Sequence, residues 1–130
     1  MKLVEKCPPR TFSVGHTGTT KISDCGQIQL ESNELVTLLT TTGREYDLVR
    51  KDWGFYATPS LNGRLVDNEL RAVLVKNMFG KFYLLLVERG SESAFEQYLD
   101  ADRLSVVTWM DSNASLARLE RGIESGAEDS

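Results

Sequence analysis

The sequence contains two apolar, β-favouring runs, "RAVLVKN" (residues 71–77) and "KFYLLLVER" (residues 81–89), which are joined by the short segment "NMFGK" (residues 77–81). Val, Tyr and Phe favour strands, and a short connection that contains Gly is typical of a β-hairpin. Because both runs are almost continuously hydrophobic, we expect central strands that are covered on both faces. The fold is therefore predicted to be built around this hairpin.

Shorter strands are predicted in the first half of the chain. The segments "GQIQL" (residues 26–30), "LVTLLT" (residues 35–40) and "EYDLV" (residues 45–49) have alternating or β-branched residues, and the segments "ESNE" and "TTGR" between them have turn chemistry. Connections this short favour antiparallel neighbours. The sequence thus predicts an antiparallel meander.

Two helices have recognisable starts. Thr58 can cap a short helix, for which Pro59 suits the first position. Further along, Ser93 and Glu96 have the spacing of a capping box at the beginning of "SAFEQYLDAD" (residues 93–102). The apolar side chains of this second segment form a stripe, which predicts an amphipathic helix.

The last part of the chain is predicted to add a strand, "LSVVTWM" (residues 104–110), and a final helical turn or two in "SNASLARLERGI" (residues 112–123). The chain ends in the small, acidic segment "ESGAEDS", and residues 121–130 are predicted to form a disordered acidic tail. We therefore expect a single α+β domain over residues 1–120, with mostly antiparallel strands in a meander and hairpins and with two or three short helices.

The charge balance excludes one class of partner. The formal net charge is -4, which argues against nucleic-acid binding through phosphates. The longest apolar run, "FYLLLV" (residues 82–87), is far shorter than the ~20 residues of a membrane helix, and the beginning of the chain lacks the features of a signal peptide. We therefore expect a cytoplasmic protein without a nucleic-acid or membrane partner.

Possible metal ligands occur in the Gly-, Thr- and Pro-rich first segment, where zinc would accept Cys7, His16, Asp24 and Cys25. The Cys-x8-His-x8-Cys spacing is not a recognised zinc pattern, and no Cys-x2-Cys pair is present. Reduced, packed cysteines and an exposed histidine are the alternative. We expect no metal and no other cofactor, and no residue is marked to orient His16 as the base for a cysteine nucleophile.

A carboxylate pair is the sequence's candidate for acid/base chemistry. Glu45 and Asp47 are two residues apart, so a strand would place both on one face. A pocket that raised one pKa would allow general acid/base catalysis. Alternating acids on the solvent face of a meander produce the same pattern.

The stretch "KDWGFYATPSLNGRL" (residues 51–65) combines aromatic, basic and amide side chains. On a strand, Trp53 and Phe55 would point to one face and Tyr56 to the other, so one aromatic set is expected in the core. A helix that starts near Thr58 would offer free N–H groups to an anion. The sequence therefore suggests a ligand site made of Lys51, Tyr56, Thr58, Ser60, Asn62 and Arg64. The alternative is a structural corner, in which Thr58 caps the helix, Arg64 is solvated and an aromatic side chain closes the edge of the core.

Four segments carry a resemblance to a known family: "WGFYATPSLNGRL", "RAVLVKN", "FYLLLVERGSESAFEQYL" and "SVVTWMD". Over residues 46–111 the chain resembles a small bacterial family that has no assigned activity and is associated with gene clusters for surface polysaccharides and unusual sugars. The resemblance transfers no catalytic residues. It implies a cytoplasmic accessory protein that acts near sugar or sugar-nucleotide metabolism.

Three functions remain open at this point. The first is a non-catalytic accessory or binding protein in surface-polysaccharide metabolism, which binds a sugar-phosphate, a nucleotide-sugar or a partner protein. The second is a small enzyme that acts on sugar derivatives through Glu45 and Asp47. The third is a protein-interaction module that forms a homo-oligomer by pairing exposed sheet edges.

Overall fold

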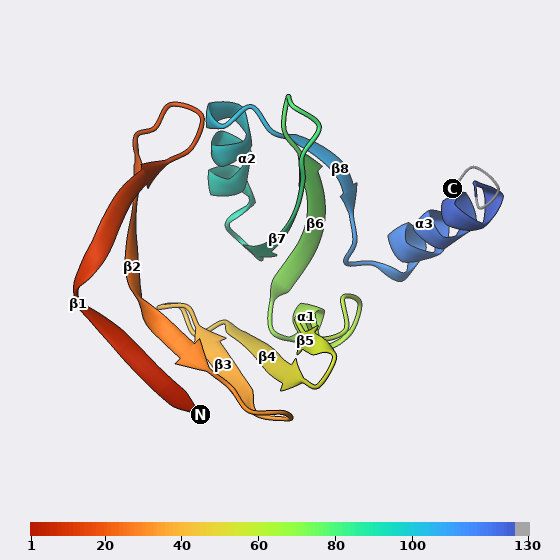
Figure 1. Cartoon of the computed structure of the whole chain (residues 1–130). Helices are drawn as coiled ribbons and strands as arrows, with labels where there is room; N and C mark the ends of the chain where they lie inside the picture. Colours follow the sequence, from red (N-terminus) through yellow and green to blue (C-terminus); the bar gives the residue numbers. More distant parts are fainter. Residues whose placement is uncertain (127–130) are drawn as a thin grey trace.

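The computed structural model describes residues 1–126, in which eight strands form three small antiparallel sheets and three helices lie beside them. Figure 1 shows the sheets along an open curve, with the β1–β2 hairpin on one side, the β3–β4–β5 sheet at the bottom and the β7–β6–β8 sheet opposite the hairpin. The predicted class, a single α+β domain with mostly antiparallel strands, is confirmed.

The first sheet is a long hairpin of β1 (Lys2–Val14) and β2 (Thr20–Gln29). Leu3 lies opposite Ile28, and Phe12 lies opposite Ile22, so these apolar side chains share one face of the hairpin. The register shifts between Glu5 and Arg10, where two prolines interrupt β1 and cannot donate ladder hydrogen bonds. The Gly-, Thr- and Pro-rich first segment, which holds the candidate metal ligands, is therefore mostly strand.

The second sheet confirms an antiparallel meander, but only two of its three strands are the predicted ones, because residues 26–29 belong to β2 and pair with β1 instead. It consists of β3 (Leu35–Leu39), β4 (Glu45–Lys51) and β5 (Gly54–Tyr56), with β4 in the centre. β4 and β5 are joined by a two-residue turn, since Lys51 pairs with Gly54. The half-buried Tyr46 of β4 packs against the core.

The third sheet contains the predicted hairpin and the predicted later strand. β6 (Leu70–Lys76) is central, β7 (Phe82–Glu88) pairs along its whole length, and β8 (Ser105–Trp109) pairs on its other side. The core consists of two buried clusters. The first joins Leu65 of α1 to β6, and the second lies between the β6–β7 strands and α2. The buried members are Leu65, Leu70 and Ala72 in the first cluster and Val73, Val75 and Val87 in the second. The expectation of two covered strands is correct for β6 and wrong for the first half of β7, which is an exposed edge.

The helices differ from the prediction mainly at their starts. α1 (Arg64–Asp67) is a single turn that begins after Gly63, and Ser60 Oγ, not Thr58, accepts a hydrogen bond from a backbone N–H of this turn, that of Arg64 (2.8 Å). Asn62 and Gly63 have low helix propensity, so the helix does not begin before Arg64.

α2 (Glu92–Ala101) confirms the second helix, but the predicted capping box is wrong. Ser93 lies inside the helix, and the flanking Ser91 makes no side-chain cap. The Glu92 carboxylate instead accepts a hydrogen bond from the N–H of Gly90 (2.8 Å), just before the helix. A negative group in the first turn is favourable there because the helix N-terminus carries a partial positive charge.

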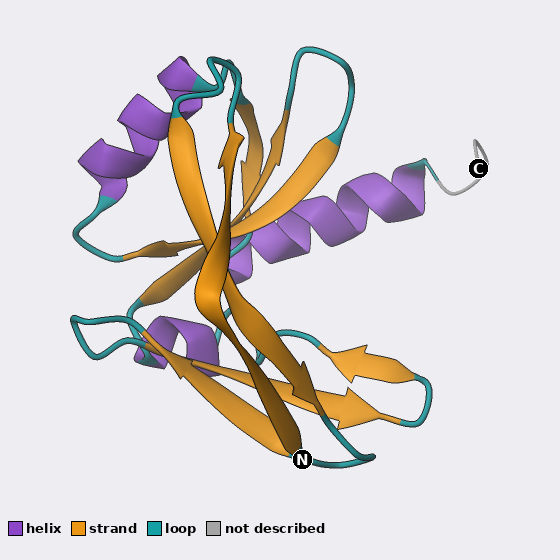
Figure 2. Ribbon diagram, turned by 60° about the vertical axis from the view of Figure 1, so that its left-hand side comes forward, coloured by secondary structure: helices purple, strands orange, loops and turns teal. Residues whose placement is uncertain are grey.

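α3 (Asn113–Ser125) is longer than the one or two turns predicted. Ser112 and Ser115 form the capping box that fixes its start, and the helix continues through residues 121–125, contrary to the prediction of a disordered tail there. The rest of that tail, residues 127–130, lies outside the described residues. Figure 2 shows α2 and α3 on opposite sides of the β6–β7–β8 strands, with α3 extending away from them. Over residues 1–126, no helix has the length and apolar character needed to cross a membrane.

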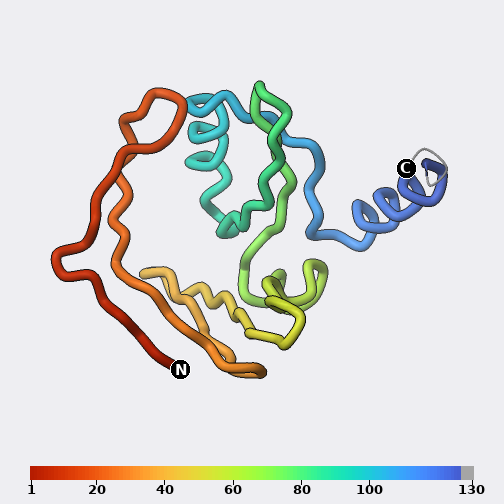
Figure 3. The backbone as a smooth tube through the Cα atoms, viewed as in Figure 1, coloured from red at the N-terminus to blue at the C-terminus, as the bar shows by residue number. Residues whose placement is uncertain are grey.

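The tip of the β1–β2 hairpin lies next to the end of α2, although more than 80 residues separate them in the chain (Figure 3). The backbone N–H of His16, in the tip, donates to Oδ1 of Asp102, which follows α2 directly (3.2 Å). At the other end of the hairpin, the N-terminal ammonium group of Met1 pairs with Glu34 (2.9 Å). Among residues 1–126, these are the two places where polar contacts tie the hairpin to the rest of the domain.

Candidate functional site

The hairpin tip, the β6–β7 turn and the end of α2 enclose an open cavity of about 550 Å³, which we call the tip cavity. It is lined by residues from all three segments: Val14, Gly15, His16, Thr20, Ile22, Asn77, Met78, Phe79, Tyr83, Leu85, Tyr98, Asp102 and Leu104. Its volume is within the range of small-molecule sites, and most of the lining is apolar or aromatic.

Aromatic rings supply much of the wall of the tip cavity. Phe79 comes from the β6–β7 turn, Tyr83 from β7 and Tyr98 from α2. Tyr98 also stacks on Phe95, with ring centroids 6.5 Å apart, and Phe95 packs into the core below α2. The position of Tyr98 is thus supported from behind, and its ring is available on the cavity side.

Polar groups of the tip cavity are few and are held in place. Asn77 Oδ1 accepts the N–H groups of Phe79 and Lys81 (both 2.9 Å), which fixes the β6–β7 turn, and Asn77 Nδ2 donates to the Tyr83 hydroxyl (3.2 Å). Asp102 accepts the His16 N–H (3.2 Å), which holds the opposite wall. A cavity with aromatic walls and a small number of positioned polar groups is suited to binding a small molecule.

The ionisation of Tyr98 reflects this setting. Partial burial raises the pKa of Tyr98, and the charge of Asp102 and a hydrogen bond to it raise this pKa further. Tyr98 therefore keeps its proton at neutral pH and can serve as a hydrogen-bond donor.

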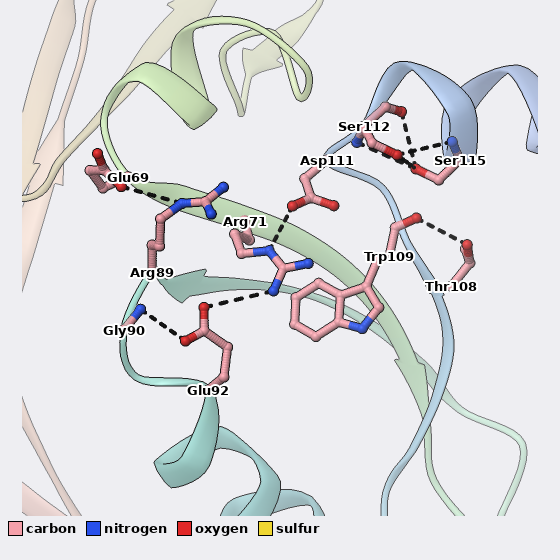
Figure 4. A network of polar contacts seen from close by, with 10 residues as sticks. All are labelled: Glu69, Arg71, Arg89, Gly90, Glu92, Thr108, Trp109, Asp111, Ser112 and Ser115. Carbon is pink, nitrogen blue, oxygen red and sulfur yellow. Dashed lines mark hydrogen bonds and ion pairs between the residues drawn. The ribbon is translucent and has the colours of Figure 1, made fainter.

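A network of charged side chains lies at the other end of the β6–β7–β8 sheet (Figure 4). Arg71 Nε pairs with Asp111 Oδ2 (2.6 Å) and Arg71 Nη1 with Glu92 Oε1 (3.7 Å), and the guanidinium lies 4.0 Å from the centroid of the Trp109 ring. Arg89 pairs separately with Glu69 (3.3 Å). The network connects the start of β6 to the end of β8 and the start of α2.

The charges of this network satisfy one another. Backbone N–H groups, its own and that of Gly90, lower the pKa of Glu92, and the charges of Arg71 and Arg89 lower it further. A general acid at neutral pH needs the opposite shift. The network is therefore suited to holding three elements together.

The proposed acid/base pair is also unsuited to proton donation. Asp47 accepts a hydrogen bond from Thr37 Oγ1 (2.8 Å) and pairs with Arg64 (2.8 Å). These two partners, Thr37 first, lower the pKa of Asp47. Glu45 lies at the exposed end of β4, opposite Leu39.

The six residues of the predicted ligand site are not gathered around one cavity. Arg64 pairs with Asp47 of β4, Lys51 Nζ donates to Asn33 Oδ1 (2.6 Å), and Asn62 Nδ2 donates to Asn113 Oδ1 at the start of α3 (2.7 Å). Each polar group thus has a partner in a different part of the fold. The ligand-site hypothesis for these residues gains no support from this geometry.

The remaining members of that predicted site are either part of the α1 turn and the core edge or exposed to solvent. Ser60 Oγ accepts the N–H of Arg64 at the start of α1, Thr58 is half-buried beside the buried Pro59, and Tyr56 is exposed. Because α1 is one turn, no helix N-terminus is present at Thr58 to attract an anion.

The aromatic side chains near β5 are exposed, contrary to the expectation that one set is core. Trp53 is 72% exposed, in the two-residue turn, and Phe55 and Tyr56 are at least half exposed. The strand has only three residues and forms a sheet edge, so neither of its faces is covered.

The candidate zinc ligands are not brought together. Cys7 and Cys25 are exposed free thiols, and His16 lines the tip cavity. Asp24 instead binds Lys6 Nζ (2.5 Å) and Arg10 Nε (3.4 Å). In the part of the chain that the structure describes, no three His, Cys, Asp or Glu side chains are grouped to hold a metal ion.

Sequence reasoning missed the tip cavity, apart from His16. One signal was present: Tyr98 and Asp102 are four residues apart, which puts an aromatic ring and a carboxylate on one side of the end of the predicted helix. The other wall comes from a hairpin tip far away in the chain, and no local pattern predicts that contact. No protein-family model, curated protein or solved structure matches this chain.

Proposed function

We propose that this protein is a non-catalytic accessory protein that binds a small ring-shaped ligand, a sugar derivative, in the tip cavity. The observation that carries the proposal is the cavity of about 550 Å³ with three aromatic rings and a few positioned polar groups in its wall. The association with surface-polysaccharide metabolism and the cytoplasm comes from the family resemblance and the N-terminal sequence, and it belongs to the same proposal.

The lining suits the two surfaces of a sugar ring. The C–H face of a sugar is apolar and packs on aromatic side chains such as Tyr83 and Tyr98. Its hydroxyl groups need donors and acceptors, which Asn77 and Asp102 provide on two sides of the cavity.

The titration of the carboxylates supports binding over catalysis. The acidic side chains of residues 1–126 whose pKa clearly departs from its ordinary value are Asp24, Glu34, Asp47 and Glu92, and all four are shifted downward. A sugar-processing enzyme of the usual kind needs a carboxylic acid with a raised pKa.

Thermal unfolding with a panel of neutral, amine-bearing and phosphorylated sugars tests the proposal. A ligand at 100 times its dissociation constant should add ~2.7 kcal/mol to the stability of the wild type. Tyr98→Ala should abolish the gain, whereas Tyr56→Ala, an exposed tyrosine outside the cavity, should leave it intact. The absence of any ligand-dependent shift in the wild type would contradict the proposal.

A second candidate function, association of two copies, is favoured by α3. A groove of about 670 Å³ runs between α3 and Thr108 of β8, and its helical side contains Leu119, Gly122 and Ile123. Ile123 is 64% exposed, and the position of a Cβ on Gly122 is open. This small and apolar stripe leaves room for a second α3 to approach closely.

Light scattering during gel filtration tests this second function. Wild-type protein should show a concentration-dependent dimer, which Ile123→Lys should dissociate. Glu124→Lys, on the neighbouring position of the same helix, is the matched control and should leave the dimer unchanged. A monomeric wild type at all concentrations would contradict it.

A further inference from the structure

The geometry points to a positively charged ligand in the tip cavity, that is, a ring compound that carries an ammonium group, as amino sugars do. This inference rests on the proposed function, because it assigns the ligand class of the same cavity. Its basis is the charge of the lining, the arrangement of Asp102 and the aromatic rings, and the close packing that holds Asp102 in position.

The lining has one carboxylate and no Lys or Arg. Asp102 is its acidic side chain, and His16 is its one residue whose side chain can gain a positive charge. It is the backbone N–H of His16 that contacts Asp102. A phosphorylated sugar would meet this carboxylate with no Lys or Arg in the lining, and repulsion between like charges disfavours such a complex. The lining therefore selects against the sugar-phosphate that the sequence alone suggested.

Asp102 keeps acceptor capacity for a ligand. Its Oδ1 accepts the His16 N–H at 3.2 Å and the carboxylate also interacts with the Tyr98 hydroxyl, but an ionised carboxylate has about four acceptor positions. An ammonium group has three donors, and a hydrogen bond between two opposite charges is about twice as strong as one between neutral groups. A ligand ammonium beside Asp102 therefore gains more than a ligand hydroxyl.

The aromatic rings strengthen the preference for a cation. Tyr98 lies one helical turn before Asp102, and Tyr83 and Phe79 line the same cavity from the β6–β7 hairpin. The face of an aromatic ring carries negative charge density and attracts an ammonium group within about 6 Å. A carboxylate next to aromatic faces is the combination that recognises amines.

The hairpin tip holds this carboxylate by close packing. Gly15 has a φ of +93, and a Cβ at this position would lie 3.1 Å from Asp102 Oδ1. A residue other than glycine would therefore strain the backbone and push against the carboxylate. The absence of a side chain at position 15 lets the tip approach Asp102 and close the cavity on that side.

Titrations followed by two-dimensional NMR of the labelled protein test the ligand class. The probes are glucosamine, glucose and glucose 6-phosphate, together with cyclohexylamine and cyclohexanol as ring compounds that differ only in the charged group. Each amine should bind at least tenfold more tightly than its neutral counterpart, and glucose 6-phosphate should bind more weakly than glucose. Resonances of the hairpin tip and the end of α2 should move.

Two variants separate charge from structure. Asp102→Asn keeps an oxygen that can accept the His16 N–H and removes the charge, so it should reduce amine binding at least tenfold while binding of the neutral ring compounds stays the same. Asp100→Asn makes the same charge change at an exposed position of α2, two residues before Asp102, and should have no effect.

The outcomes distinguish the inference from the proposed function. If neutral and amine-bearing compounds bind equally well at the tip cavity, the inferred ligand class is wrong and the proposed function stands. Unchanged amine affinity in Asp102→Asn would likewise overturn the inference. If no ring compound moves any resonance of the cavity, the proposed function itself is wrong and the inference falls with it.

Discussion

The β6–β7–β8 sheet and the β1–β2 hairpin are both antiparallel, but they bury very different amounts of apolar surface. Apart from Pro59, the buried apolar side chains of residues 1–126 lie between Leu65 and Val87. The hairpin has none, and Leu3 and Ile28, which lie opposite each other on its two strands, are 58% and 47% exposed. Since stability comes mainly from buried apolar surface, the sheet is the stable part of the domain and the hairpin depends on it.

This difference assigns separate roles to the two walls of the tip cavity. Tyr83 and Tyr98 belong to the part with a core, and Val14, Gly15 and Ile22 belong to the part without one. A ligand between them would add contacts to the hairpin that the free protein lacks. Binding sites are commonly built from segments of low local stability on a stable support.

The largest effect on stability is expected at Leu65 of α1, which is fully buried against Leu70 and Ala72 of β6. Leu65→Ala should lower the free energy of unfolding by about 3 kcal/mol, because it removes apolar contacts and leaves a cavity. Urea denaturation followed by circular dichroism measures the change. The control in the hairpin, Leu3→Ala, should change it by less than about 0.5 kcal/mol, as exposed positions do. Equal losses in the two variants would show that the hairpin has a core of its own.

The second largest effect is expected at Arg71. Arg71→Ala should cost about 2 kcal/mol, because it leaves the Asp111 carboxylate, 11% exposed, without its partner. Arg89→Ala is the matched control and should cost at most about 0.5 kcal/mol, since Arg89 and Glu69 are both about half exposed. The same denaturation experiment measures both. Similar costs for the two variants would mean that the network in Figure 4 does not hold the sheet to α2.

The two regions also differ in how far the sequence predicts them. The β6–β7 hairpin is predictable because its strands are adjacent in the chain and because buried strands need the apolar residues that the sequence shows there. The β1 strand is not, because two prolines and a Gly/Thr-rich tip resemble a loop, and its pairing with β2 depends on the ladder rather than on burial.

The candidate site is less predictable than the fold, for a related reason. Arg64 near a predicted helix start suggests an anion site, but Asp47, which neutralises its charge, lies on β4, far away in the sequence. Conversely, Asp102 becomes part of a cavity only because the hairpin tip reaches it across the fold. Local sequence patterns identify residue types at a site, whereas the partners that neutralise or complete them come from tertiary contacts.

A smaller effect is expected when the protein is acidified. The hydrogen bond from Lys6 is the main cause that lowers the pKa of Asp24 in the hairpin. A carboxylate whose pKa is lower in the folded than in the unfolded state stabilises the fold above the unfolded value, about 3.9, and this contribution is lost as the pH falls through the folded value. The resonances of β1 and β2 should therefore change below pH ~4, before those of β6. In Asp24→Asn this early transition should be absent, and its persistence would assign the acid sensitivity to another group.

The smallest effect on stability, and the sharpest separation of the two regions, is expected at Ile22. This side chain lines the tip cavity from β2 and is 42% exposed. Ile22→Ala should change the free energy of unfolding by about 0.5 kcal/mol or less, because a large part of its side chain stays exposed in the free protein and it does not belong to a buried cluster. The variant should weaken ligand binding several-fold, because a bound ring would cover the same side chain.

Thr20→Ala, in the same wall of the tip cavity, is the control that tests whether loss of apolar area or loss of any contact is responsible. It should weaken binding less than Ile22→Ala. A large loss of stability in Ile22→Ala without a loss of affinity would reverse the roles of the two regions, making the hairpin part of the core and the cavity wall incidental.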